Sequence, residues 1–120
     1  MSGWVLVGAL CAVALSALAQ LALKLGADAV AWTGGVLAAT RAMATQPMVL
    51  GGVMIYGVSV AIWVWVLSRT ELSVAYPFAA VSFVMTAALG WLVLGETLSA
   101  QRLLGLALIV AGCLVVARSA

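Results

Sequence analysis

The charged side chains of this chain are few, and they are so placed that four long stretches carry no charge. Of the 120 residues, 7% are charged and 68% are apolar, whereas about a quarter of the residues in a typical soluble domain are charged. A charge at the centre of a bilayer is costly, and a helix needs roughly 20 apolar residues to cross one. The pattern therefore predicts a multi-pass membrane protein. The charge-free stretches are residues 1–23, 42–68, 72–95 and 103–117.

We expect residues 1–120 to form a single all-α domain with four transmembrane helices. Lipid offers no hydrogen-bond partners to backbone N–H and C=O groups, so each crossing must be helical. Four crossings place both termini on one side of the membrane. Lys and Arg are divided almost evenly between the two sides. Their small excess on the side opposite the termini favours termini outside the cytoplasm, and the near balance permits insertion in both directions. The expected spans are about 3–25, 47–67, 74–94 and 100–118.

Composition excludes several classes of function. The net charge of +2 is too small and too scattered for a nucleic-acid surface, so no nucleic-acid partner is expected. Histidine is absent, and we interpret Cys11 and Cys113 as small core residues rather than metal ligands or a disulfide. Since the sequence has no recognisable nucleophile–base pair or metal cluster, we expect neither an enzyme nor a cofactor.

The connections between the spans have features of their own. Residues 26–46 are long for a connection in so small a membrane protein, and we expect residues 29–44 to contain an interfacial segment. Pro77 falls near the first turn of the third span, where a missing N–H is tolerated. Thr97 and Ser99 are candidate N-caps of the fourth span. The aromatic residues toward span ends, which we interpret as interfacial anchors, are Trp4, Trp63, Trp65 and Trp91.

The predicted interfacial segment has two faces on a helical projection. The apolar face consists of Trp32, Val36, Ala39 and Met43, and the residues turned away from it are Thr33, Thr40 and Arg41.

The first span carries the most informative polar set. Ser16, Gln20 and Lys24 recur every four residues and so share one face of a helix. One interpretation is a polar wall that faces a cavity, with Lys24 at its mouth to meet an anion. The alternative is that Ser16 bonds its own backbone, Gln20 bonds a neighbouring helix and Lys24 extends to the lipid headgroups.

The third span offers a second set of polar groups. Tyr76 lies beside Pro77 and is either an interfacial residue or the closure of a cavity mouth. Ser82 and Thr86 are one turn apart and either line a cavity or bond backbone carbonyls. Glu96, in the short connection 95–99, could carry a proton, but we interpret it as a residue of the hairpin or of the next helix start.

Small residues mark one face of the last span. Gly105 and Gly112 are seven residues apart, with Ile109 between them, and such faces allow helices to approach closely. We assign this face to packing, between subunits rather than around a substrate. Four tightly bundled helices cannot enclose a headgroup, so we expect the chain to act as a dimer, each copy being half a transporter.

These residues lie in segments that resemble the drug/metabolite transporter superfamily, in its EamA-like, four-helix branch. Within that branch the chain looks like the small subunits proposed to flip aminoarabinose-phosphoundecaprenol across the bacterial inner membrane. The resemblance covers most of the chain except residues 26–46. The segments that carry it are Ser16–Lys24, Val74–Pro77 with Ser82–Val84, and Gly95–Gln101 leading to Gly105 and Gly112.

The chain is also similar, more distantly, to small multidrug resistance transporters. In that family a glutamate eight residues before the first-helix lysine binds proton and cation in turn. Lys24 matches that lysine, but the position eight residues earlier is Ser16. The missing carboxylate argues against proton-coupled cation export of that type.

The leading hypothesis is therefore a flippase subunit for an anionic polyprenyl-phosphate-linked sugar or a related lipid. The headgroup would pass Ser16, Gln20, Tyr76 and Ser82, and Lys24 would engage the phosphate. The partner would be an identical chain or a similar four-helix subunit. Two alternatives stay open: a small multidrug resistance-type exporter, and a membrane subunit that stabilises a partner without transporting anything.

Overall fold

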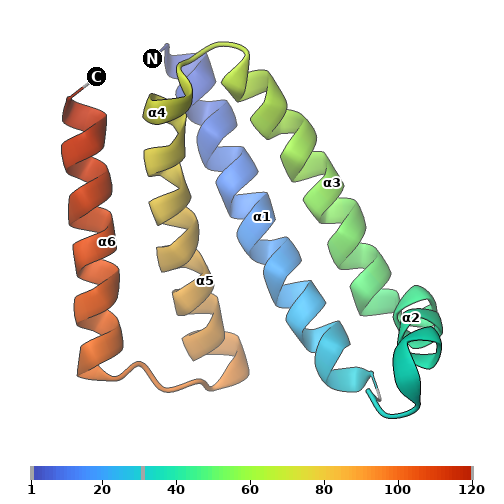
Figure 1. Cartoon of the computed structure of the whole chain (residues 1–120). Coiled ribbons are helices and arrows are strands. Elements are labelled where there is room, and N and C mark those ends of the chain that lie inside the picture. The colour runs from blue at the N-terminus through green and yellow to red at the C-terminus, as the bar shows by residue number, and fades with distance from the viewer. Residues whose placement is uncertain (1, 31, 120) are drawn as a thin grey trace.

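The computed structural model describes residues 2–30 and 32–119, and within them every regular element is helical. Four long helices lie side by side, and Figure 1 shows them in the order α6, α5, α1, α3. The start of α1 and the end of α6 lie at one end of the molecule, and α2 lies at the other. The all-helical prediction is thus confirmed. The elements are α1 Gly3–Ala29, α2 Gly35–Thr45, α3 Pro47–Leu67, α4 Leu72–Ala75, the short 3₁₀ helix η1 Tyr76–Phe78, α5 Ala79–Leu94 and α6 Ala100–Arg118.

Three helical segments are long and apolar enough to cross a membrane. They are α1, α3 and the run Leu72–Leu94 that joins α4, η1 and α5. The apolar part of α6 is shorter, Ala100–Val116, so a fourth crossing stays a prediction. The first helix continues past the expected end at residue 25 to Ala29, and its 27 residues exceed the roughly 20 that span a bilayer. Lys24 and Asp28 consequently lie on the same helix.

Glycines bring α1 and α3 into close contact. Gly52 of α3 is buried, and a Cβ atom there would lie 2.9 Å from Leu23 Cγ and 3.1 Å from the Ala19 backbone oxygen. At the far end of the pair, a Cβ on Gly26 would lie 2.8 Å from the Val49 backbone nitrogen. Helices in lipid associate largely through such close dispersion contacts. The sequence analysis assigned packing to the last helix and did not identify this interface.

A break at Pro77 separates α4 from α5. The helical run starts at Leu72, two residues before the expected start at 74, and Pro77 lies near the beginning of the 3₁₀ turn η1 that precedes α5. Proline has no N–H to donate to the carbonyl four residues back, and its ring clashes with that carbonyl. The chain adopts one 3₁₀ turn there instead, in which the Ala79 N–H donates to the backbone oxygens of Tyr76 and Pro77.

Helix α6 stands beside α5 at the end of an irregular connection (Figure 1). Ser99 is the N-cap, because its Oγ accepts from the Arg102 N–H at 3.2 Å. Thr97 is not a cap; its backbone oxygen instead accepts from Arg102 Nη1 at 3.0 Å. None of the side chains described on α6 is buried. Within the described part of the chain, a Cβ atom on Gly105 or Gly112 would meet no atom within 4 Å.

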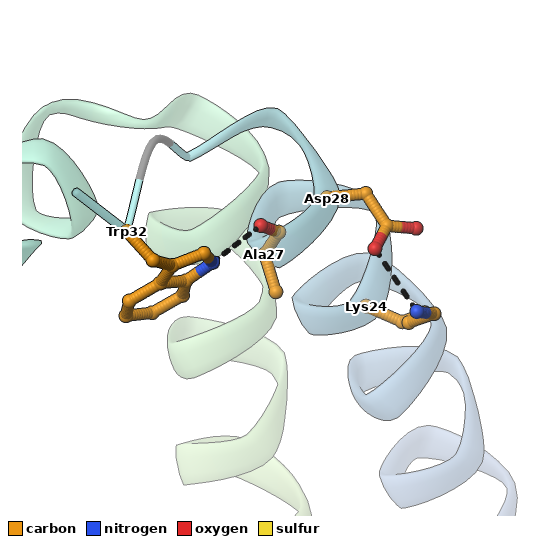
Figure 2. A network of polar contacts seen from close by, with 4 residues as sticks. All are labelled: Lys24, Ala27, Asp28 and Trp32. Atoms are coloured by element: carbon orange, nitrogen blue, oxygen red, sulfur yellow. Dashed lines mark hydrogen bonds and ion pairs between the residues drawn. The ribbon is translucent and has the colours of Figure 1, made fainter.

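The predicted interfacial segment is partly helical. Helix α2 begins at Gly35, directly after its N-cap Gly34, and both glycines have positive φ, so Trp32 and Thr33 lie outside the helix. The Trp32 Nε1–H donates to the Ala27 oxygen at 3.1 Å and holds the indole against the end of α1 (Figure 2). No residue of α2 is buried, and Val36 is 85% exposed. Its position at the membrane interface stays a prediction, and Ala31 of that segment lies outside the described residues.

The interpretation of both cysteines as core residues is wrong for Cys11. Its side chain is exposed on the outer face of α1, and Cys113 on α6 is half-buried. An apolar outer face suits a helix that contacts lipid, so burial cannot be inferred from apolar surroundings in such a chain.

The contact between α1 and α3 can be tested with two neighbouring glycines. In an open helical position, Gly→Ala stabilises by about 0.5–1 kcal/mol, because alanine loses less backbone entropy. Gly51→Ala should therefore keep or raise the melting temperature, since no described atom lies within 4 Å of its Cβ position. Gly52→Ala should lower it, because Leu23 and the Ala19 carbonyl must move. Tryptophan fluorescence during thermal unfolding in detergent micelles measures both, and equal responses would contradict the assigned interface.

Candidate functional site

A cavity of about 200 Å³ lies among α1, α3, η1 and α5, and we name it the central cavity. Its wall combines hydroxyl groups and aromatic rings with small apolar side chains. Such a mixture can hold a ligand with both polar and apolar surface. The lining residues are Ala12, Val13, Ser16, Tyr56, Ser59, Val60, Trp63, Tyr76, Ala79 and Ser82.

Three of the residues expected from the sequence meet in this cavity. Ser16 comes from the middle of α1, Tyr76 from the 3₁₀ turn η1, and Ser82 from the first turn of α5, which follows η1. Tyr76, Ala79 and Ser82 recur every three residues, so η1 and α5 present them on one face. In the part of the chain that the structure describes, neither serine hydroxyl bonds a backbone carbonyl, so both are available to a ligand.

Helix α3 contributes two aromatic side chains and one hydroxyl that were not predicted for the site from the sequence. Tyr56, Ser59 and Trp63 lie on the face of α3 turned toward the cavity, and Ser59 is only 4% exposed. Their spacing of three and four residues is a helical stripe that could have indicated a shared face. Trp63 was interpreted as an interfacial anchor; its ring instead lies edge-to-face against Tyr76, with centroids 6.3 Å apart and planes at 84°. Such pairs stabilise ring positions, so this wall is preorganised.

A second cavity of about 250 Å³ lies one helical turn further along α1 and α5, and we name it the end cavity. It contains the other two members of the predicted polar set, Gln20 and Lys24, so the stripe on α1 passes from one cavity to the next. Thr86 also lines it, and its hydroxyl donates to the Ser82 oxygen at 2.7 Å. The backbone-bonding alternative therefore holds for Thr86. The lining residues are Ala17, Gln20, Leu21, Lys24, Thr86, Leu89, Gly90, Leu94 and Glu96.

Lys24 is held at the rim of the end cavity by an ion pair. Its Nζ lies 2.9 Å from Asp28 Oδ1, one turn further along α1 (Figure 2). The two side chains are 52% and 57% exposed, and ion pairs that open to water contribute little stability. An incoming phosphate can therefore compete with Asp28 for the ammonium group. The four-residue spacing of Lys24 and Asp28 was the signal for this pair, and it was overlooked because Asp28 was assigned to the connection.

Comparison with known proteins places the chain among membrane transporters. A family model described as the EamA-like transporter family matches residues 2–118. The probable 4-amino-4-deoxy-L-arabinose-phosphoundecaprenol flippase subunit ArnE of Sodalis glossinidius is 37% identical over 99 residues, which cover 82% of this chain and 83% of that protein. The protein of the same name from Pseudomonas syringae is 33% identical over 109 residues, 88% of this chain and 94% of its own length.

A relative with a different subunit name matches less of the chain. The probable flippase subunit ArnF of Sodalis glossinidius is 34% identical over 71 residues, 58% of this chain and 55% of that protein. No solved structure matches the chain significantly.

Water in the central cavity can be tested by thiol labelling. A charged methanethiosulfonate reagent reacts with thiolates in water, and lipid keeps thiols protonated and unreactive. In a background with Cys11 and Cys113 replaced by alanine, Ser82→Cys should react at least about tenfold faster than Phe83→Cys, whose side chain points away from both cavities. The rates are measured by mass shift in membrane vesicles. Equal, slow labelling at both positions would show that water does not enter the central cavity.

Proposed function

The chain belongs to the EamA-like transporter family, and from that premise we propose that it is a subunit of a flippase for a polyprenyl-phosphate-linked sugar in the bacterial inner membrane. The observation that carries this proposal is the central cavity, where Ser16, Ser59 and Ser82 face the aromatic rings. A sugar ring has hydroxyls around its edge and C–H groups on its faces. Hydroxyl side chains suit the first and aromatic rings suit the second. The names of the ArnE relatives, which specify a sugar on a polyprenyl phosphate, support the same substrate class.

The order of the two cavities suits a lipid-linked headgroup. The central cavity is neutral, and Lys24 adds a positive group at the rim of the end cavity. We propose that the sugar occupies the central cavity while Lys24 engages the phosphate, through a charge-assisted hydrogen bond that replaces its bond to Asp28. The polyprenyl tail stays among the apolar outer faces of the helices, in the bilayer.

The size of the cavities supports the proposal that one chain is half of the transporter. Small-molecule sites usually enclose about 300–1,000 Å³, and the two cavities hold about 200 and 250 Å³. A second four-helix subunit would complete the enclosure by packing on the open face of α6, at Gly105, Ile109 and Gly112. The partner is a copy of this chain or a similar small subunit. The occurrence of both ArnE and ArnF names among the relatives supports two similar subunits.

The competing function is export of a lipophilic cation. Tyr56, Trp63 and Tyr76 offer ring faces that could attract a positive charge. No carboxylate lines the central cavity within the described residues, however, so a cation there would lack the counter-charge that proton-coupled exchange requires. This difference makes the sugar the better ligand.

Reconstitution into vesicles tests the proposed function. The protein, alone and with the similar small subunit from the same genome, should expose a polyprenyl-phosphate-linked sugar from the inner leaflet to periodate added outside. Trp63→Ala should slow this exposure at least about tenfold, because it removes one wall of the central cavity. Trp91→Ala is the matched control, an exposed tryptophan on α5 that lines neither cavity. Cation-driven proton flux without movement of the sugar lipid would reject the proposal in favour of the exporter.

The subunit contact is tested on α6. Gly112→Leu should weaken association at least about tenfold, because a leucine side chain holds the two helices apart. Gly57→Leu is the control, since Gly57 is an exposed glycine of α3 with open space around it. Subunit number is counted by single-molecule photobleaching in vesicles. Loss of association in the control but not in Gly112→Leu would move the contact from α6 to α3. If transport persists in single subunits, the half-transporter proposal is wrong.

A further inference from the structure

The backbone at the end of α5 directs Glu96 back toward the helix bundle. Gly95 adopts the left-handed conformation, with φ of 69°, which ends the helix and reverses the chain. The N–H groups of Gly95 and Glu96 both donate to the Gly90 oxygen, the second at 3.1 Å. The first residue after the turn is thereby held against the last turns of α5, and its side chain lines the end cavity with Gln20 and Thr86.

Gly90 provides the space that the Glu96 carboxylate occupies. Gly90 is buried, and a Cβ atom at that position would collide with Glu96 Oε1. The carboxylate therefore rests on bare backbone, at a place where any larger residue would displace it. A glutamate that served only the turn would have no need of this contact.

The basic side chains of Lys24 and Arg102 bond to oxygens other than those of Glu96. Lys24 Nζ pairs with Asp28, and Arg102 Nη1 donates to the Thr97 oxygen. Within residues 2–30 and 32–119, no Lys or Arg nitrogen lies within 4.0 Å of the Glu96 carboxylate. The end cavity thus contains an anion without an ion-pair partner, beside a cation that is weakly held.

Three residues that line the end cavity carry oxygen acceptors. They are Glu96 with its carboxylate, Thr86 with its hydroxyl and Gln20 with its side-chain amide. The Thr86 hydroxyl donates its proton to the backbone oxygen of Ser82, which leaves the lone pairs of the Thr86 hydroxyl oxygen free to accept. A primary ammonium group has three N–H donors and one positive charge, and this set supplies acceptors and the counter-charge for it.

We propose that Glu96, Thr86 and Gln20 form a binding site for a primary ammonium group. This inference rests on the proposed function and narrows it: the headgroup carries an amine as well as the phosphate that Lys24 engages. The ammonium group of the headgroup would then face Glu96, and its phosphate would face Lys24, in the same cavity. Two lipids offer this chemistry, a polyprenyl-phosphate-linked amino sugar and phosphatidylethanolamine, and the experiment separates them.

Binding is measured by isothermal titration calorimetry on the full-length protein in detergent micelles. The probes are a farnesyl-phosphate-linked amino sugar and the same compound with its nitrogen acetylated, which removes the charge. A second pair of probes is short-chain phosphatidylethanolamine and phosphatidylglycerol. The wild-type protein should bind the free amine about tenfold more tightly than the acetylated compound, the ratio that one charge-assisted hydrogen bond provides.

Matched variants assign that preference to the carboxylate. Glu96→Gln keeps the shape but removes the charge, and the preference should fall to about twofold or less. Glu71→Gln makes the same change in the exposed connection at the opposite end of the molecule and should keep the full preference. Gly90→Ala should act like Glu96→Gln because it displaces the carboxylate, while Gly57→Ala, in open space, should not.

Each result has a defined meaning. Retention of the amine preference by Glu96→Gln, or equal wild-type binding of both sugar probes, overturns the ammonium site and leaves the proposed sugar flippase standing. A preference that depends on Glu96 for phosphatidylethanolamine, without binding of either sugar probe, keeps the ammonium site and rejects the sugar substrate. Absence of binding by all four probes overturns both.

Discussion

The close packing of α1 against α3 is the contact on which the rest of the structure depends. It is made at Gly52 and Gly26, where the helices approach so closely that a Cβ atom would touch backbone. In lipid no hydrophobic driving force holds helices together, so dispersion at such contacts must do it. With α3 packed on one side, α1 lies between α3 and α5. Ser16 lines the central cavity among these helices, and Gln20 and Lys24 line the end cavity along α1 and α5.

Two breaks in helical geometry lie next to residues that line the cavities. Pro77 belongs to the 3₁₀ turn that begins with Tyr76, a residue of the central cavity, and the positive φ of Gly95 returns Glu96 to the end cavity. Both breaks lie at the ends of α5, where a change in backbone direction costs few internal hydrogen bonds. The same helix therefore contributes to both cavities, and the residues between the breaks keep Ser82 and Thr86 one turn apart.

Charge spacing was sufficient to predict the helices, because lipid penalises charge strongly and the eight charged residues must lie near helix ends or connections. The four-residue repeat of Ser16, Gln20 and Lys24 likewise indicated a shared face. Tyr56, Ser59 and Trp63 share one face of α3, but the rest of that helix is apolar all round. Because lipid-facing and buried residues of such a helix look alike, the sequence did not show that this face turns inward, and the three residues were missed. Glu96 was assigned to its connection because the return of its side chain depends on the three-dimensional path of the turn.

The two cavities differ in charge: of the residues that the structure describes, no charged one lines the central cavity, whereas Lys24 and Glu96 line the end cavity. A neutral hydroxyl loses far less hydration energy than an ion on leaving water, so Ser16, Ser59 and Ser82 can lie deep among the helices at moderate cost. Lys24, Asp28 and Glu96 lie where α1 and α5 end, and Figure 1 shows these helix ends at the same end of the molecule as α2; water can solvate the charged groups there. Under the proposed function, a headgroup that enters there would meet the charged groups first and the hydroxyl-lined wall one helical turn later. Its ionic groups would then be bound close to water, and the neutral central cavity would have to accept only uncharged surface.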